Sequence, residues 1–175
     1  MRKVNLFLLS VLAVMIAAAL LAQGNRASPH EKVTATIAGK AITIEYGRPF
    51  MKGRTIYGGL VPFGKVWRTG ADEATMLTAE GDLMIGSLHV PKGSYSLFTI
   101  PGEKEWTLVV NKVAKQWGAY KYEQGSDLGR VTMKVESLSA PVEQLTIAIN
   151  SKGGNQGEIR VSWEKTAASA GIMVH

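Results

Sequence analysis

Alternation of apolar and polar residues is the feature of this sequence that most constrains its fold. The clearest case lies in the C-terminal third, where two alternating runs flank a Gly-rich turn at 151–157. Their apolar members are Leu145, Ile147, Ile149, Ile159, Val161 and Trp163. A period of two places successive side chains on opposite faces of a β-strand. Two such runs joined by a Gly-rich turn predict a β-hairpin.

The same alternation recurs along most of the chain. Further runs lie at Val33–Ile37, Ile42–Tyr46, Thr75–Glu80, Ser94–Ile100, Trp106–Asn111 and Val131–Val135. Beyond the N-terminal segment, no stretch of more than about ten residues shows the i, i+3, i+4 stripe of an amphipathic helix. We therefore predict an all-β fold. It is an antiparallel β-sandwich, or a barrel-like arrangement, of roughly 8–10 short strands with a long irregular segment after the second strand.

The N-terminus has the pattern of a secretory signal peptide. Arg2 and Lys3 precede an almost wholly apolar run at Leu6–Leu21, and small residues at 20–24 offer a cleavage site. The alternative is an uncleaved membrane anchor, because Val4–Ala22 approaches the length of about 20 residues that spans a bilayer. Small residues close the run and no charge cluster follows it, so cleavage is the favoured interpretation.

These features predict the organisation of the chain and its location. At 175 residues the chain has room for one domain and a targeting segment. We expect a signal peptide at 1–22, a flexible lead-in at 23–32, a single β domain at 33–166 and a C-terminal tail at 167–175. The mature protein is expected to be periplasmic or secreted, with no membrane partner after cleavage.

Composition excludes several classes of function. The chain has no Cys, so it cannot form a disulfide, a thiolate metal site, a lipid anchor on Cys or a cysteine nucleophile. Without Arg2 and Lys3 the formal net charge falls from +6 to +4, leaving 18 basic and 14 acidic side chains. These charges are dispersed rather than clustered, so no nucleic-acid partner is expected. The sequence carries no signal for an oligomeric state.

The segment Tyr46–Thr75 interrupts the alternation and has no clean period. A long irregular segment in a compact domain is usually functional or disordered, and its large apolar residues argue against disorder. Arg48, Lys52 and Arg54 place three cations close together in it, and a guanidinium suits planar partners such as carboxylate or phosphate. The glycine spacing matches neither a phosphate loop nor a dinucleotide fingerprint.

The residues that follow add a second group of polar side chains. On an extended strand Arg68 and Asp72 would share one face, while Trp67 and Glu73 would lie on the other. In one interpretation Arg68 and Asp72 line a polar pocket beside Trp67. In the other, which the sequence favours, they pair to hold a long loop in place.

Other chemical signatures are weak. His30, His89 and His175 are far apart in sequence and show no zinc-ligand spacing. No GxSxG motif is present. We therefore expect no metal and no cofactor. An aromatic set could stack on sugars or could anchor core and loops, and packing is the favoured interpretation. Its members are Trp106, Trp117, Tyr120 and Tyr122.

Several motifs are shared with a known family. They are YGRP at 46–49, KGR at 52–54, GGLVP at 58–62, the run 66–75, PKGSY at 91–95, the run 97–101, and Trp106. In these the chain resembles, from about residue 28 to 165, an exported bacterial family catalogued as domain of unknown function 2911. The resemblance implies an exported β-rich domain with no established activity. Asp72 stands where the family often has Asn, which favours a hydrogen-bonding role over a catalytic one.

Three hypotheses about function follow. The leading one is an exported β-sandwich that binds a small polar or anionic ligand, or a glycan, in the cell envelope. Its candidate ligand-binding residues are Arg48, Lys52, Arg54, Trp67, Arg68 and Asp72. The second is an envelope hydrolase that uses Asp72 or Glu73, although no catalytic residue is assigned. The third is an envelope interaction module with an exposed apolar patch, whose candidate members are Phe50, Ile56, Tyr57 and Phe63.

Overall fold

The computed structural model describes residues 26–175 and shows an all-β protein, as predicted. The predicted signal peptide at 1–22 lies outside the described residues. Within 26–175 no helix has the length and hydrophobicity of a membrane span. A 3-10 turn, η1, covers Gln124–Ser126. The strands are β1 His30–Ile37, β2 Lys40–Gly47, β3 Ala71–Ala79, β4 Leu83–Ile85, β5 Leu88–Val90, β6 Gly93–Ile100, β7 Glu105–Asn111, β8 Asp127–Gly153 and β9 Gln156–Val174.

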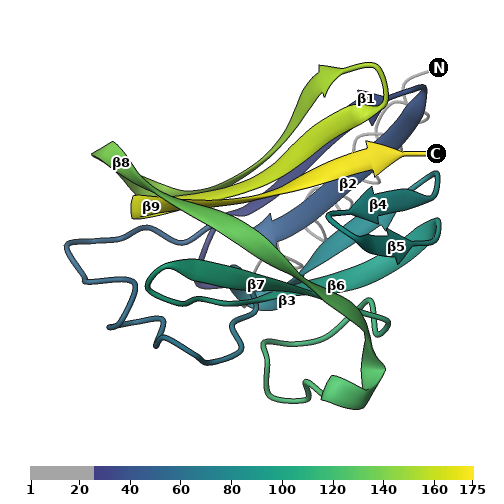
Figure 1. The fold of residues 1–175 in the computed structure, drawn as a ribbon. Coiled ribbons are helices and arrows are strands. Elements are labelled where there is room, and N and C mark those ends of the chain that lie inside the picture. The colour runs from purple at the N-terminus through teal and green to yellow at the C-terminus, as the bar shows by residue number, and fades with distance from the viewer. Residues whose placement is uncertain (1–25) are drawn as a thin grey trace, which may run out of the picture.

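The strands form one antiparallel sheet that folds over on itself without closing into a barrel. Their order across the sheet is β1-β2-β3-β6-β7-β8-β9-β4-β5. Strands β8 and β9 curve across the whole molecule, so two parts of the sheet face each other (Figure 1). β1 at one edge of the sheet therefore lies near β8 and β9.

Local sequence explains the first hairpin. Residues Ala38 and Gly39 connect β1 to β2 and both have positive φ, at 48° and 75°. Two positive φ values in a two-residue turn match the right-handed twist of the strands that it joins. The register that follows places Ile42, Ile44 and Tyr46 on the buried face of β2.

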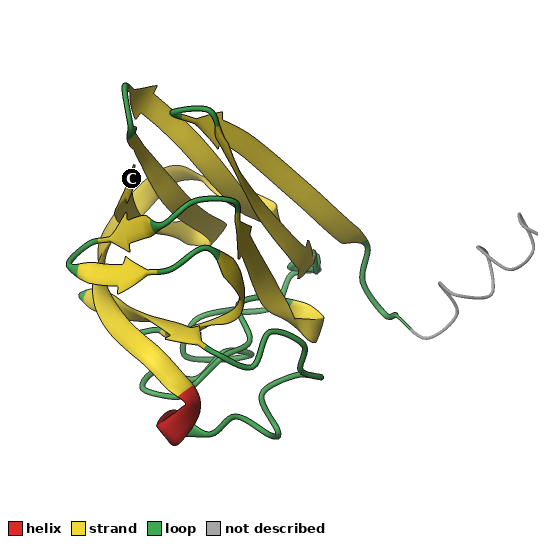
Figure 2. Cartoon of the chain, turned by 90° about the vertical axis from the view of Figure 1, so that its right-hand side faces the viewer, coloured by secondary structure: helices red, strands yellow, loops and turns green. Residues whose placement is uncertain are grey.

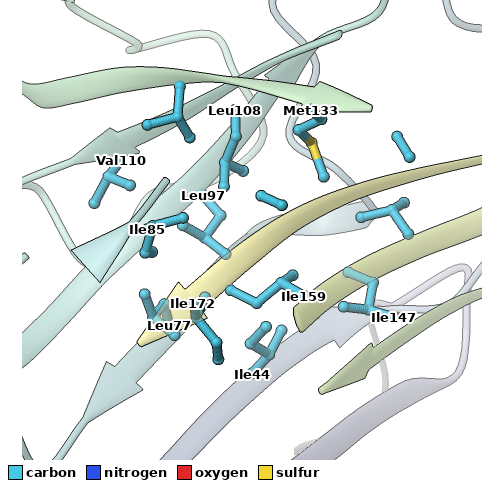
Figure 3. Close-up of a cluster of buried hydrophobic side chains, with 14 of the residues drawn as sticks. Ile44, Leu77, Ile85, Leu97, Leu108, Val110, Met133, Ile147, Ile159 and Ile172 are labelled. Atoms are coloured by element: carbon cyan, nitrogen blue, oxygen red, sulfur yellow. The ribbon is translucent and has the colours of Figure 1, made fainter. Parts of the chain in front are cut away.

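The core lies between the two facing parts of the sheet. Its side chains come from nearly every strand and meet across the interior (Figure 3). Those drawn there include Ile44, Leu77, Ile85, Leu97, Leu108, Val110, Met133, Ile147, Ile159 and Ile172. Burial of apolar area at about 25 cal/mol per Å² is the main source of stability in such a core.

Two strands are much longer than the short strands that the sequence predicts. The predicted runs around Val131–Val135 and 145–149 are two parts of β8, which has 27 residues. The register with β9 shifts between Ser137 and Val142, where the strand bends. Residues 167–174, assigned above to a tail, form the end of β9, and Ala167, Ala168 and Ile172 are buried there.

The outer face of β3, β6 and β7 carries a smaller apolar cluster. Ala74, Phe98 and Val109 are buried there. The ring of Tyr122 packs on Phe98 with centroids 5.0 Å apart, so the connection 112–126 covers this face. That connection and the one at 48–70 are the longest in the described chain, and both lie toward the lower end of the view in Figure 2.

Strands β2 and β3 approach most closely where the connection 48–70 leaves the sheet. A Cβ built on Gly47 would lie 2.1 Å from the backbone oxygen of Ala71. Only glycine fits such a contact without movement of the backbone. We call this contact the neck of the loop.

We predict that Gly47→Ala destabilises the domain by about 3 kcal/mol, because the added methyl forces the β2–β3 ladder apart. Urea denaturation measures this loss. Gly171→Ala is the matched control, since nothing lies within 4 Å of a Cβ at this strand glycine, and its effect should stay within about 0.5 kcal/mol. Equal losses in both variants would contradict the steric account of the neck.

Candidate functional site

The long segment after β2 is ordered by hydrogen bonds to other strands at both ends. The Met51 amide donates to the Glu143 carbonyl at 2.7 Å, and the Leu145 amide donates to the Pro49 carbonyl at 3.0 Å. At its other end Trp67 and Thr99 exchange two backbone bonds of 2.8 and 2.9 Å. Residues 48–70 thus bridge β8 and β6.

Aromatic rings under this segment attach it to the core. Trp67 stacks on Trp163 with centroids 6.0 Å apart, and Tyr57 meets Trp106 edge-on at 4.8 Å. Such pairs add about 0.5–1.5 kcal/mol beyond the buried area. Burial raises the pKa of Tyr57, as does the nearby charge of Glu164, and its hydroxyl has no hydrogen-bond partner in the described part of the chain.

This packing contradicts the apolar patch of the interaction-module hypothesis. Ile56 is fully buried, and Tyr57 packs against the core. Phe50 and Phe63 remain partly exposed. The side chains expected to form one patch therefore divide between the interior and the surface.

A pocket of about 490 Å³ opens between the long segment and the start of β3. We call it the long-loop pocket. Five of the six candidate ligand-binding residues line it: Lys52, Arg54, Trp67, Arg68 and Asp72. The other lining residues are Ala27, Ser28, Pro49, Phe50, Leu60, Val61, Gly70, Ala71 and Trp163.

The charged residues of the long-loop pocket are three cations and one carboxylate. Arg54 Nε and Nη2 donate to the carbonyls of Met51 and Phe50, at 3.0 and 2.7 Å. The Lys52 amide donates to Glu143 at 2.8 Å, while within 26–175 its ammonium makes no hydrogen bond or ion pair. The pocket therefore has an excess of positive charge.

Arg68 differs from the other arginines of the described chain. Its Nε is buried and has no hydrogen-bond partner among residues 26–175. Arg68 and Asp72 line the same pocket but form no ion pair there, so they do not brace the loop by pairing. Leaving a buried donor unsatisfied costs about 1–3 kcal/mol, and more for a charged group.

Arg48 has a structural position instead. It does not line the pocket, and its guanidinium is fully engaged. Nε donates to the Leu145 carbonyl at 2.8 Å, Nη1 to Glu31 at 2.8 Å and Nη2 to Thr146 Oγ1 at 2.9 Å. Arg48 holds β1, β8 and the loop together.

The strand alternation expected for 67–73 is wrong at its start. Trp67 lies with Arg68 and Asp72 in one pocket, while Glu73 faces away from it. The reason is that Thr69 and Asp72 have φ of 57° and 61°, so the chain turns sharply here instead of running extended. The expected divergence of Asp72 from Glu73 is confirmed.

Asp72 and Glu73 are both held by the lead-in to β1. The amides of Ala27 and Ser28 lie 3.4 Å from the Asp72 carboxylate. Arg26 binds Glu73 at 2.7 Å, and His30 Nε2 lies 3.1 Å from the same carboxylate. Burial alone would raise the pKa of Glu73, but the bonds from Arg26 and its own amide and the charges of His30 and Arg26 bring it below the ordinary value of 4.5.

This environment does not suit the hydrolase hypothesis. A general acid near neutral pH needs a raised pKa, whereas that of Glu73 is lowered. Asp72 and Glu73 line different pockets, and His30 Nε2 lies between them, 3.7 Å from Asp72 and 3.1 Å from Glu73. Within 26–175 no group of three His, Asp or Glu side chains could hold a metal ion.

Comparison with protein families decides where the chain belongs. The family described as protein of unknown function (DUF2911) matches residues 28–172. The chain is a member of this family. Comparisons with curated proteins and with solved structures each gave no match. The family is thus the one relationship found, and it assigns no activity to the DUF2911 domain described above.

Sequence reasoning missed several residues of these pockets. Phe50 and Leu60 line the long-loop pocket from the connection 48–70, and Trp163 lines it from β9. The lead-in was expected to be flexible. Arg26 and His30 hold it in place. Both are basic residues of the predicted lead-in 23–32, which is the one indication in the sequence that it could pair with carboxylates. The partner carboxylates lie more than 40 residues away, so only the fold brings them together.

We predict that Arg48→Ala destabilises the DUF2911 domain by about 2 kcal/mol, because three hydrogen bonds between separate elements are lost. Urea denaturation checks this. Lys52→Ala, in the same segment, should change stability by less than about 0.5 kcal/mol. Arg48→Lys should recover less than half of the loss, since an ammonium cannot replace the planar fork. Full recovery would contradict this role.

We predict that Glu73→Gln lowers stability at pH 7 and not in acid. A lowered folded-state pKa means that the carboxylate stabilises the fold above about pH 4.5, and that this contribution disappears as the pH falls through the lowered pKa. Urea midpoints of wild type and Glu73→Gln should therefore converge as the pH falls through the lowered pKa of Glu73. Glu103→Gln, at an exposed position of the β6–β7 turn, should match wild type at every pH.

Proposed function

We propose that this DUF2911 domain binds a small carboxylate-bearing ligand in the long-loop pocket, as an exported protein of the cell envelope. The observation that carries the proposal is Arg68, a cation in the wall of that pocket whose buried Nε has no partner among residues 26–175. The signal-peptide pattern of the N-terminus supports the proposed location.

Electrostatics favour an anion. Lys52, Arg54 and Arg68 outnumber Asp72 among the charged lining residues, and an arginine fork matches the two oxygens of a carboxylate. The backbone amides at Ala27 and Ser28 already engage Asp72, which reduces the repulsion between that carboxylate and an anionic ligand.

The apolar part of the pocket favours a ligand with a ring or another flat apolar face. Trp67 and Trp163 line the pocket and are nearly parallel, with 16° between their planes. Phe50 and Leu60 add exposed apolar surface at the same pocket. The pocket volume lies within the usual range of small-molecule sites, about 300–1,000 Å³. Sugar acids and aromatic carboxylates have both features.

The proposal makes the stability of Arg68 variants informative. If Arg68 serves a ligand, its buried Nε without a partner among residues 26–175 costs stability in the free domain, as functional groups often do. We expect Arg68→Leu to leave the free energy of unfolding unchanged or to raise it by up to about 1 kcal/mol. A loss of 2 kcal/mol or more, as expected for Arg48→Ala, would instead identify Arg68 as a brace.

A thermal-shift titration tests binding directly. The probes are glucuronate, galacturonate, N-acetylneuraminate, benzoate and inorganic phosphate. At a hundredfold excess over its Kd a ligand stabilises the folded state by about 2.7 kcal/mol, which raises the Tm of a domain of this size by roughly 5–10 °C. We expect such a shift for at least one carboxylate, and a smaller shift in about 1 M salt, where charges are screened.

The matched variants separate a site from a general charge effect. Arg68→Leu and Lys104→Ala each remove one positive charge, but Lys104 lies on the β6–β7 turn and does not line the pocket. Arg68→Leu should abolish the shift and Lys104→Ala should keep it. The proposal fails if no carboxylate shifts the wild-type Tm, or if both variants respond alike.

A further inference from the structure

A second pocket, of about 450 Å³, lies on the other side of the lead-in. We call it the Trp117 pocket. Arg26 lines the Trp117 pocket, whereas the next two residues, Ala27 and Ser28, line the long-loop pocket. The lead-in therefore forms part of the wall between them. The lining residues of the Trp117 pocket are Arg26, His30, Glu45, Tyr46, Glu73, Ala74, Met76, Ala114, Lys115, Gln116 and Trp117.

Trp117 is exposed although its backbone is fixed. It is 54% exposed and forms a bridge with Glu73 of β3. The hydrogen bonds on either side of it are Ala74 N to Gln116 O at 2.9 Å and Gly118 N to Asp72 O at 3.0 Å. An exposed indole on an anchored backbone offers apolar surface with little conformational entropy left to lose on binding.

A buried asparagine makes the connection that carries Trp117 rigid. Asn111 is fully buried at the end of β7. Its Oδ1 accepts from the Val113 amide at 3.1 Å and from Gln116 Nε2 at 3.0 Å. Its Nδ2 donates to the Glu123 carbonyl at 3.2 Å and to Asp127 at 3.0 Å. One side chain thus ties both ends of the loop, which preorganises the surface presented by Trp117.

The polar groups of the Trp117 pocket differ in kind from those of the long-loop pocket. The carboxylates Glu45 and Glu73 line it together with the basic side chains Arg26, His30 and Lys115, so acceptors and donors stand side by side. Carboxylates accept hydrogen bonds, and guanidinium and ammonium groups donate them. A ligand with many hydroxyl groups can use both kinds at once, because each hydroxyl is both a donor and an acceptor.

We propose that the Trp117 pocket binds a neutral saccharide built of β-linked hexopyranoses with equatorial hydroxyls. In such a sugar the ring hydrogens form a flat apolar face, which suits stacking on an indole. Its hydroxyls project around the ring edge toward the carboxylate and cationic groups of the pocket. The volume suits one or two rings, within the range of small-molecule sites.

Isothermal titration calorimetry with cellobiose and with N,N′-diacetylchitobiose tests the proposal. We expect wild type to bind at least one of them, and Trp117→Ala to bind it about tenfold more weakly or worse. Trp117→Phe should keep an intermediate affinity, because an aromatic face remains. Tyr120→Ala is the matched control: Tyr120 is the most exposed aromatic residue of the same loop, at 87%, and does not line the pocket.

Specific results would overturn the proposal. These are no binding of either disaccharide to wild type at millimolar sugar, equal weakening in Trp117→Ala and Tyr120→Ala, or unchanged affinity in Trp117→Ala. Thermal unfolding of each variant confirms that it is folded, and Trp117→Phe serves if Trp117→Ala is not. Lys104→Ala, at a position that lines neither pocket, should leave disaccharide affinity unchanged.

Discussion

The close contact of β2 with β3 at the neck of the loop is the constraint on which the candidate site depends. Because Gly47 and Ala71 hold the two strands together there, residues 48–70 leave and re-enter the sheet at nearly the same place. A segment of this length with its ends so close cannot stretch across the sheet as a strand. Its backbone instead forms hydrogen bonds with β8 at one end and with the end of β6 at the other.

Those partners determine what the segment can enclose. The stacking of Trp67 on Trp163 brings the second half of the segment down onto the core, while the Arg48 bonds hold its first half at β8. Between these attachments Ile56 and Val61 are buried in the core, and the long-loop pocket lies between the segment and the start of β3. The half-buried Arg68 lines this pocket with its Nε buried and without a partner among residues 26–175, and a buried donor without a partner costs stability. Because the buried Nε forms no hydrogen bond within residues 26–175 that would offset this cost, we favour a functional role for Arg68.

Alternation along the sequence was sufficient for the fold class, the first hairpin and the last one, because one face of each strand is buried and the other is not. Alternation did not predict the structure where neighbouring side chains are similar in size. Residues 167–171 of β9 are all small, so Ala167 and Ala168 resembled a tail although both are buried. It also failed at Thr69 and Asp72, whose positive φ has no reliable signature in residues other than glycine. Five of six candidate side chains do share a pocket, because they lie in one segment that folds back on itself. Trp163 and the lead-in also line this pocket. Their positions depend on contacts between residues far apart in sequence, which a local sequence pattern cannot predict.

The two long strands have a consequence for how the molecule responds as a whole. β8 and β9 each take part in both facing layers, so neither layer has a complete set of hydrogen-bond partners without the other. The domain should therefore unfold as one cooperative unit rather than layer by layer. Amide hydrogens in the central parts of β8 and β9 would exchange only through global opening. A ligand held in either pocket would then slow exchange across the entire sheet, including strands that it never touches.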